Sequence, residues 1–144
     1  MNCICYRKDY KYQLHDDYTV STPVKPEQDI HTRFIELSTD GILIIKSGYA
    51  WDGPSGPTID SRNFRRGSLV HDAFYQLMRH KQLPQHIKND SDRLLQAMCR
   101  EDGMSRIRSW LVYQGVKYFG HPSTDPANKK TDLAAPQGCT CRHK

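Results

Sequence analysis

The sequence of 144 residues has few hydrophobic side chains and no long run of them. Hydrophobic residues make up 37 % of the chain, which predicts a compact core and thinly packed ends. No stretch approaches the ~20 apolar residues of a membrane-spanning helix, and residues 1–18 lack the apolar centre of a signal peptide. We therefore expect a protein of the cytoplasm that does not associate with membranes.

Long blocks of one charge are missing as well. The formal net charge is +5 and the pI is near 9.0, but the basic residues are scattered along the chain. Such a surface attracts polyanions through counterion release, and neither a helix-turn-helix nor an RNA-binding signature is present. A generally basic surface with weak, non-specific affinity for nucleic acids is favoured over a dedicated nucleic-acid site.

Cysteine is confined to the two ends of the chain, apart from Cys99. Cys3 and Cys5 form one Cys-x-Cys pair, and Cys139 and Cys141 form the other. The pairs could hold one zinc ion between the termini, although such sites more often use Cys-x-x-Cys. Disulfide bonds would need an oxidising compartment. Free thiols are the third alternative and the favoured one.

The first half of the sequence predicts an antiparallel sheet. Segments 10–14 and 18–22 alternate between polar and apolar residues, as strands do. The β-rich segments 33–37 and 42–47 flank Asp40-Gly41, which is the pattern of a β-hairpin. Segment 48–60 is dense in glycine and proline and predicts a loop.

The second half predicts three helices. Ser68 can cap the first, which should run through Met78. The second is expected around residues 87–101, with Asp90 or Ser91 as its cap, and the third from Ser105 to residue 119. The stripe that the third helix is expected to bury consists of Ile107, Leu111, Val112, Val116 and Phe119.

These elements together predict an α+β fold in which a small antiparallel sheet packs with three helices. Residues 1–120 are expected to form one domain. Residues 121–144 contain proline, glycine and lysine with few large apolar groups, which predicts an extended tail ending in Cys-x-Cys.

The loop Gly48–Pro57 (GYAWDGPSGP) is one half of a candidate polar site. Asp52 in this loop has two interpretations. It either accepts hydrogen bonds from nearby amides to fix a turn, or it is a metal ligand or general base that the binding residue Trp51 shields from water.

A His-Asp step on the first expected helix is the other half. His71 and Tyr75 lie one turn apart on a shared face, and Asp72 points about 100° away. Imidazole and carboxylate groups can converge on one metal ion. The alternative is that His71 is buried against a backbone carbonyl and Asp72 stabilises the N-terminal end of the helix.

Asp92 is the third acid of the candidate site. It either faces His71, or it is a first-turn acid that pairs with Arg93 or Gln96. In the first case Asp52, His71 and Asp92 would bind one divalent ion, zinc or manganese.

Four segments in order carry a resemblance: 49–57 (YAWDGPSGP), 66–77 (RGSLVHDAFYQL), 92–95 (DRLL) and 116–120 (VKYFG). Together they resemble the bacteriophage and prophage proteins of domain-of-unknown-function family 1353, over about residues 32–120. The resemblance implies a viral or prophage origin and a single small domain, but no reaction. It falls on Asp52, His71, Asp72 and Asp92, while the cysteine-bearing ends lie outside it.

Two functions fit this sequence. The first, slightly favoured by the residue types, is a small metal-dependent hydrolase acting on a cell-wall peptide or a phosphoester. In it Asp72 would orient His71 or act as general base, and Tyr75 and Arg66 would stabilise developing negative charge.

The second is a non-catalytic viral component, such as a tail, baseplate or assembly protein, or a binder of a host protein. The same side chains would then form a buried polar network. Other virion proteins or a host protein are the expected partners. The expected location is the host cytoplasm, with incorporation in the virion as an alternative.

Overall fold

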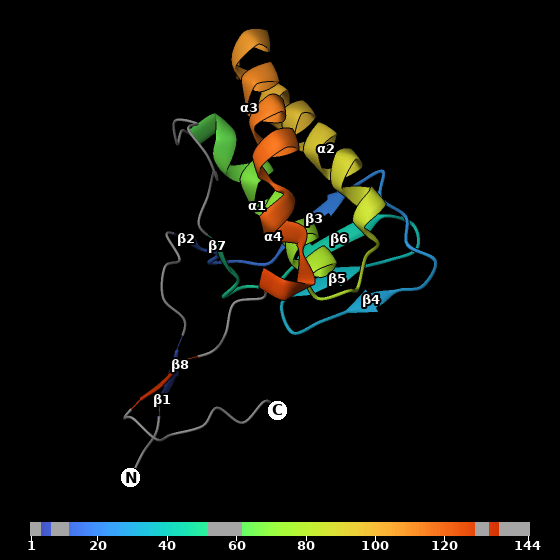
Figure 1. Cartoon of the computed structure of the whole chain (residues 1–144), viewed down its shortest axis with the longest axis vertical. Helices are drawn as coiled ribbons and strands as arrows, with labels where there is room; N and C mark the ends of the chain where they lie inside the picture. The colour runs from blue at the N-terminus through green and yellow to red at the C-terminus, as the bar shows by residue number, and fades with distance from the viewer. Residues whose placement is uncertain (1–3, 7–11, 52–61, 129–132, 136–144) are drawn as a thin grey trace.

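We describe the fold from a computed structural model, which describes residues 4–6, 12–51, 62–128 and 133–135 (Figure 1). The α+β class expected from the sequence is confirmed, since antiparallel strands fill the first part of the chain and helices follow. Among the described residues, no helix is both long and apolar enough to cross a membrane.

The strands form one four-stranded sheet and two short pairs. The four-stranded sheet is antiparallel in the order β3-β6-β5-β4, and its strands are β3 (Tyr18–Ser21), β6 (Ile42–Ile45), β5 (Ile35–Leu37) and β4 (Ile30–His31). The two pairs are β2 (Tyr12–Gln13) with β7 (Ala50–Trp51), and β1 (Ile4–Tyr6) with β8 (Leu133–Ala135).

The hairpin expected around Asp40-Gly41 is confirmed. β5 and β6 pair in the register Leu37↔Leu43, and Gly41 has φ of 86°, a conformation that L-residues rarely adopt. A Cβ atom at Gly41 would lie 2.3 Å from the carbonyl oxygen of Thr22, so the turn also needs glycine for space. The hairpin fixes which face of the sheet points to the core, because a shift of one residue would turn every side chain over.

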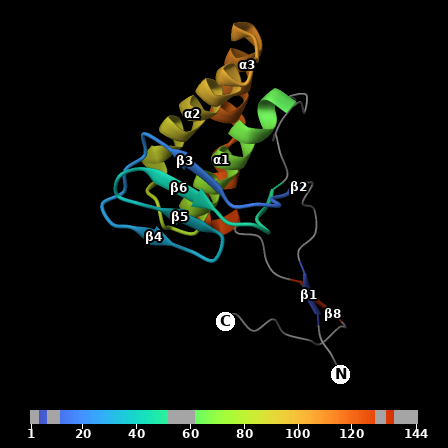
Figure 2. The same cartoon turned by 180° about the vertical axis from the view of Figure 1, so that it is seen from behind.

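Four α-helices follow the sheet, with two short 3₁₀ segments between and after them. Their bounds are α1 (Arg62–Arg79), α2 (Lys88–Glu101), α3 (Arg106–Phe119) and α4 (His121–Thr124), with η1 (Gln85–Ile87) and η2 (Pro126–Asn128). Figures 1 and 2 show α1 between the sheet and the α2–α3 pair. The buried side chains agree, because one apolar cluster joins α1 to the sheet and a second joins Phe64 of α1 to α2 and α3.

Helix α1 begins at Arg62, six residues before the expected start at Ser68. Ser68 is not a cap but lies inside the helix, where its hydroxyl donates to the carbonyl of Arg65 (2.8 Å). Tertiary packing extends the helix: Phe64 is buried, and a Cβ at Gly67 would lie 3.0 Å from the side chain of Leu95. Burial against α2 therefore outweighs the local capping signal.

The expected cap of the second helix was also wrong. The residue that precedes α2 is Ile87, which makes no side-chain cap hydrogen bond, so Asp90 and Ser91 lie within the helix. The third helix agrees with the expected bounds, since α3 spans Arg106–Phe119. Ser105, directly before it, caps the helix by accepting a hydrogen bond from the amide of Arg108 (3.2 Å).

Of the five residues expected to form the buried stripe of α3, two are buried and three are exposed. Val112 and Val116 are buried, but Ile107, Leu111 and Phe119 are exposed. The helix has apolar side chains on two opposite faces, and the sequence pattern alone does not distinguish the face that meets the core. The chain after Gly120 also differs from a purely extended tail, because it starts with α4 and η2.

Candidate functional site

The carboxylate of Asp92 is the centre of a buried polar network. One oxygen, Oδ1, accepts hydrogen bonds from Nε2 of His71 (2.7 Å) and from the hydroxyl of Tyr75 (2.5 Å). The other, Oδ2, accepts from the ammonium group of Lys88 (2.8 Å). Asp92 is 0 % exposed and His71 is 4 % exposed, so these bonds form away from water.

The helices bring these side chains together from two directions. His71 and Tyr75 lie one turn apart on α1, with their ring centroids 3.9 Å from each other. Lys88 and Asp92 lie one turn apart on α2. The network therefore ties α1 to α2 at one point near the first turn of α2.

Lys88 extends the network to a third helix. Its ammonium group also donates to the backbone carbonyls of Val116 (3.0 Å) and Lys117 (3.2 Å) near the C-terminal end of α3. The last carbonyls of a helix have no partner within the helix and carry partial negative charge. A buried cation stabilises this end, so the position of α3 depends on the ion pair in α2.

A glycine allows this close approach. A Cβ at Gly120, directly after α3, would lie 2.5 Å from the hydroxyl oxygen of Tyr75. Glycine at this position leaves room for the Tyr75 hydroxyl beneath the end of α3.

The charges of the network are set by burial and by its hydrogen bonds. Burial lowers the pKa of His71, because it disfavours the imidazolium more than the neighbouring Asp92 favours it. Burial alone would raise the pKa of Asp92, but its bonds to His71, Lys88 and Tyr75 outweigh burial and lower it. The pKa of Tyr75 is raised, first by burial and then by Asp92. The network thus contains an ionised Asp92 and a neutral His71 that donates through Nε2.

This geometry gives Asp92 a different role from the one its residue type indicates. Both of its carboxylate oxygens accept hydrogen bonds from His71, Tyr75 and Lys88. Asp92 therefore orients these three side chains. Among the residues that the structure describes, no three His, Cys, Asp or Glu side chains come together as a metal site would need. Asp52 lies outside the described residues, so the divalent-metal hypothesis stays a prediction.

The Trp51 loop does begin beside this part of α1. The indole Nε1 of Trp51 donates to the hydroxyl of Ser68 (3.2 Å), and its ring packs with Tyr12 and Tyr49. Ser68 lies less than one turn before His71, so the start of the loop and the His-Asp step share one region of the protein. Asp72 is half-buried on the same helix.

Other predicted site residues lie elsewhere. Arg66 does not join the network, because its guanidinium binds Asp102 (2.9 Å) and Glu101 (2.8 Å) at the far end of α2. Cys5 lies in β1, and the other three terminal cysteines lie outside the described residues. Cys99 is buried and free, and burial raises its pKa to about 11.

The sequence analysis did not predict two contacts of this network, the Lys88–Asp92 ion pair and the contact of Lys88 with α3. The spacing of Lys88 and Asp92 is that of a helical ion pair and could have signalled their contact. The contact of Lys88 with α3 has no such signal, because it depends on how two helices meet.

Comparison of the chain with protein-family models, with curated proteins and with solved structures gives no match.

We predict that Lys88→Met destabilises the fold by about 3–5 kcal/mol, because it leaves a buried carboxylate without its cation. The free energy of unfolding is measured by urea denaturation. Arg93→Met is the matched control, since Arg93 is exposed on the same helix, and it should change stability by no more than about 0.5 kcal/mol. Equal effects of the two substitutions would contradict the role of Lys88.

We also predict that acid destabilises the protein through His71. Its pKa is lower in the folded protein, so below about pH 6.5 the unfolded chain binds the proton first and stability falls by up to about 1.4 kcal/mol per pH unit. Asp92 acts in the same direction only below about pH 4. Unfolding free energies at pH 7.5 and 5.5 measure the slope.

His71→Gln should remove part of that slope, since glutamine can donate to Asp92 but does not titrate. His86→Gln is the matched control, because it makes the same substitution at an exposed histidine outside the network. A slope that is the same in wild type and His71→Gln would show that His71 does not resist protonation in the folded state.

Proposed function

We propose that this chain is a non-catalytic binding or assembly component, and that it binds its partner through the outer face of α3. The observation that supports this proposal most is the exposure of large apolar side chains on that helix. They are Ile107 (76 % exposed), Trp110 (52 %), Leu111 (53 %) and Tyr118 (67 %). We call this set the outer face of α3.

The outer face lies opposite the side of α3 that packs in the core. Successive residues turn by ~100°, so Ile107 and the buried Val116, nine positions later, point in opposite directions. Leu111 and Tyr118 follow Ile107 at four and eleven positions and share its side. Exposed apolar side chains that share one side of a helix, with tryptophan and tyrosine among them, are typical of protein interaction sites.

The buried network supports a structural role for the polar residues. Asp92 has no exposed surface, and its two oxygens receive three hydrogen bonds from two helices. Such a network fixes α1, α2 and α3 relative to one another and so holds the outer face in one conformation. A preorganised surface loses less conformational entropy when it binds.

The resemblance of four segments to family 1353 supports a bacteriophage or prophage origin. On that basis the partner of the outer face is another virion protein or a protein of the host, met in the host cytoplasm or within the virion.

The proposal is tested by placing a photo-crosslinking amino acid at position 110 or 118, or at Ile42 and Lys25 as controls away from α3. After illumination of infected host cells, a binding component gives the same discrete crosslinked species from 110 and 118. That species should disappear in Leu111→Ser, because serine removes apolar contact without changing charge. No species at 110 and 118, or equal species at all four positions, would contradict the proposal.

One observation favours a second function, the metal-dependent hydrolase. His71 donates through Nε2 to a buried carboxylate, and that arrangement fixes the orientation of histidines that use their other nitrogen as a base or a metal ligand. Asp92 would then be a positioning residue, while Nδ1 of His71, Asp52 and Asp72 would meet the ion or the substrate. A zinc or manganese ion would supply an activated water there.

The hydrolase predicts one stoichiometric metal ion in the purified protein, measured by mass spectrometry. Asp52→Asn and His71→Gln should each lose it while circular dichroism shows an intact fold. Cys3→Ser with Cys5→Ser should retain it, which separates this ion from one held by the chain ends. Wild type without an ion, or with an ion lost only in the cysteine variant, rules the hydrolase out.

A further inference from the structure

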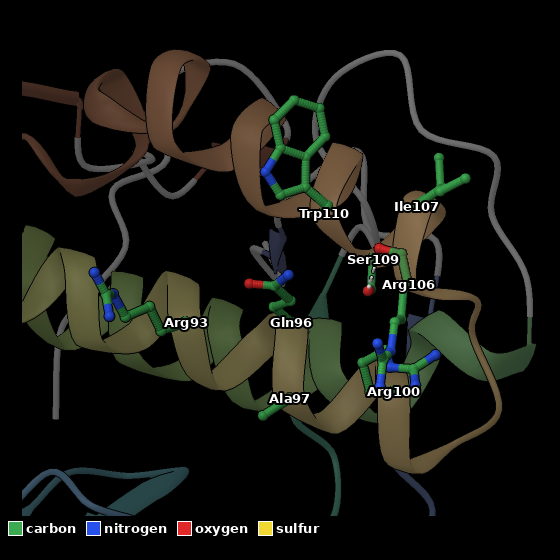
Figure 3. A pocket seen from close by; sticks show the side chains of 8 residues that line it. All are labelled: Arg93, Gln96, Ala97, Arg100, Arg106, Ile107, Ser109 and Trp110. Atoms are coloured by element: carbon green, nitrogen blue, oxygen red, sulfur yellow. Dashed lines mark hydrogen bonds between the residues drawn. The ribbon is translucent and has the colours of Figure 1, made fainter.

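A groove runs beside the outer face of α3, between α3 and α2. Its volume is about 720 Å³, and the side chains that form it include Arg93, Gln96 and Arg100 from α2 and Arg106, Ser109 and Trp110 from α3. Figure 3 shows Trp110 over the middle of the groove near Gln96, with Arg100 and Arg106 together at one end and Arg93 towards the other. The groove thus has an aromatic centre and positive ends.

The positive charge of the groove is not neutralised by its surroundings. None of the eight residues that line it is acidic. Of the acids along α2, Asp92 is buried and pairs with Lys88 (2.8 Å), while Glu101 and the following Asp102 bind Arg66 (2.8 and 2.9 Å). Asp90 lies three residues before Arg93 and makes no ion pair with it among the described residues. Within the described part of the chain, the side chains of Arg93 and Arg106 make no ion pair or hydrogen bond.

The start of α3 adds to this charge. The N-terminal end of a helix carries partial positive charge and usually attracts acidic residues. The first turn of α3 has none and carries Arg106 instead. Arg106 does not stabilise α3 at this end of the helix. The charge of its guanidinium is therefore available for a partner.

We infer that the groove binds an acidic amphipathic helix of a partner protein. This inference rests on the proposed function and names the chemistry of its partner. Two packed helices leave a groove that fits a third, with apolar side chains beside Trp110 and acidic side chains at Arg93, Arg100 and Arg106. Surface charges of this kind add specificity and speed of association to the affinity that apolar burial supplies.

Charge argues against a second copy of this chain as the occupant. If two copies packed α3 against α3 in antiparallel orientation, Arg106 of each would approach Lys117 of the other, which is repulsive. A lipid surface fits a protruding face better than a groove between helices. Single-stranded nucleic acid would use Trp110 and the arginines but not the aliphatic Ile107 and Leu111.

The test uses three hydrocarbon-stapled 16-residue helices with the same leucine stripe. Their flanking positions carry glutamate, glutamine or lysine, and affinity is measured by fluorescence anisotropy. The glutamate helix should bind about tenfold more tightly than the glutamine helix, and the lysine helix more weakly than both. This difference should shrink when NaCl is raised from 50 to 300 mM, because salt screens surface charges.

Variants connect the binding to the groove. Trp110→Ala should weaken the glutamate helix at least ~10-fold, and Ile42→Ala, another exposed apolar position, should not. Arg93→Gln with Arg106→Gln should abolish the preference for glutamate over glutamine, while Lys25→Gln should preserve it. Trp110 and the two arginines are exposed, so these variants are expected to fold, and thermal melting checks this.

The outcomes separate this inference from the proposed function. Equal binding of glutamate and glutamine helices overturns the acidic partner, while the crosslinking result for the outer face still stands. Absence of binding by all three helices at 1 mM overturns the inference as well. So does tighter binding of a 20-nucleotide single-stranded DNA or of anionic lipid vesicles that is lost in Trp110→Ala.

Discussion

The arrangement of the helices depends on the hydrogen bonds that the carboxylate of Asp92 accepts. This carboxylate receives hydrogen bonds from His71, Tyr75 and Lys88 at a position with no surface exposed to solvent. A buried ionised group is tolerated only when its charge and its lone pairs are all matched. Each donor must therefore keep its position, and so must the helix on which that donor lies. Lys88 adds α3 to the set through two backbone carbonyls.

Lys88 is placed where its own helix gives it no advantage. It is the first residue of α2, at the end whose partial charge is positive, and it is stabilised instead by the negative end of α3. The positive charge of Lys88 and the partial negative charge at the end of α3 thus stabilise each other. Neither would be stable when buried without the other. This dependence makes α2 and α3 one rigid unit, and the groove between them keeps its shape.

Much of the fold was predictable from the sequence, and the reasons for the exceptions are physical. The hairpin at Gly41 and the extent of α3 from Ser105 to Phe119 follow from local rules, and both were predicted. The start of α1 and the inner face of α3 depend on what each helix packs against, which local pattern does not contain. The pairing of His71 with Asp92 was one of two interpretations of these residues. The contact of Lys88 with α3 was not predicted, because the carbonyls of Val116 and Lys117 lie 28 and 29 residues away in the sequence.

The distribution of side-chain size on α3 argues that its outer face is functional. The inner face carries the small side chains Ser109, Val112 and Val116, which let α3 pack closely on α2. The larger apolar side chains, including Trp110, point to solvent. Exchanging them for polar residues would improve solubility without loss of core packing, so stability alone does not account for them. The Ser105 cap stabilises the start of α3, and the two hydrogen bonds from Lys88 hold its end against α2. The large apolar side chains of α3 remain free for contact with another molecule.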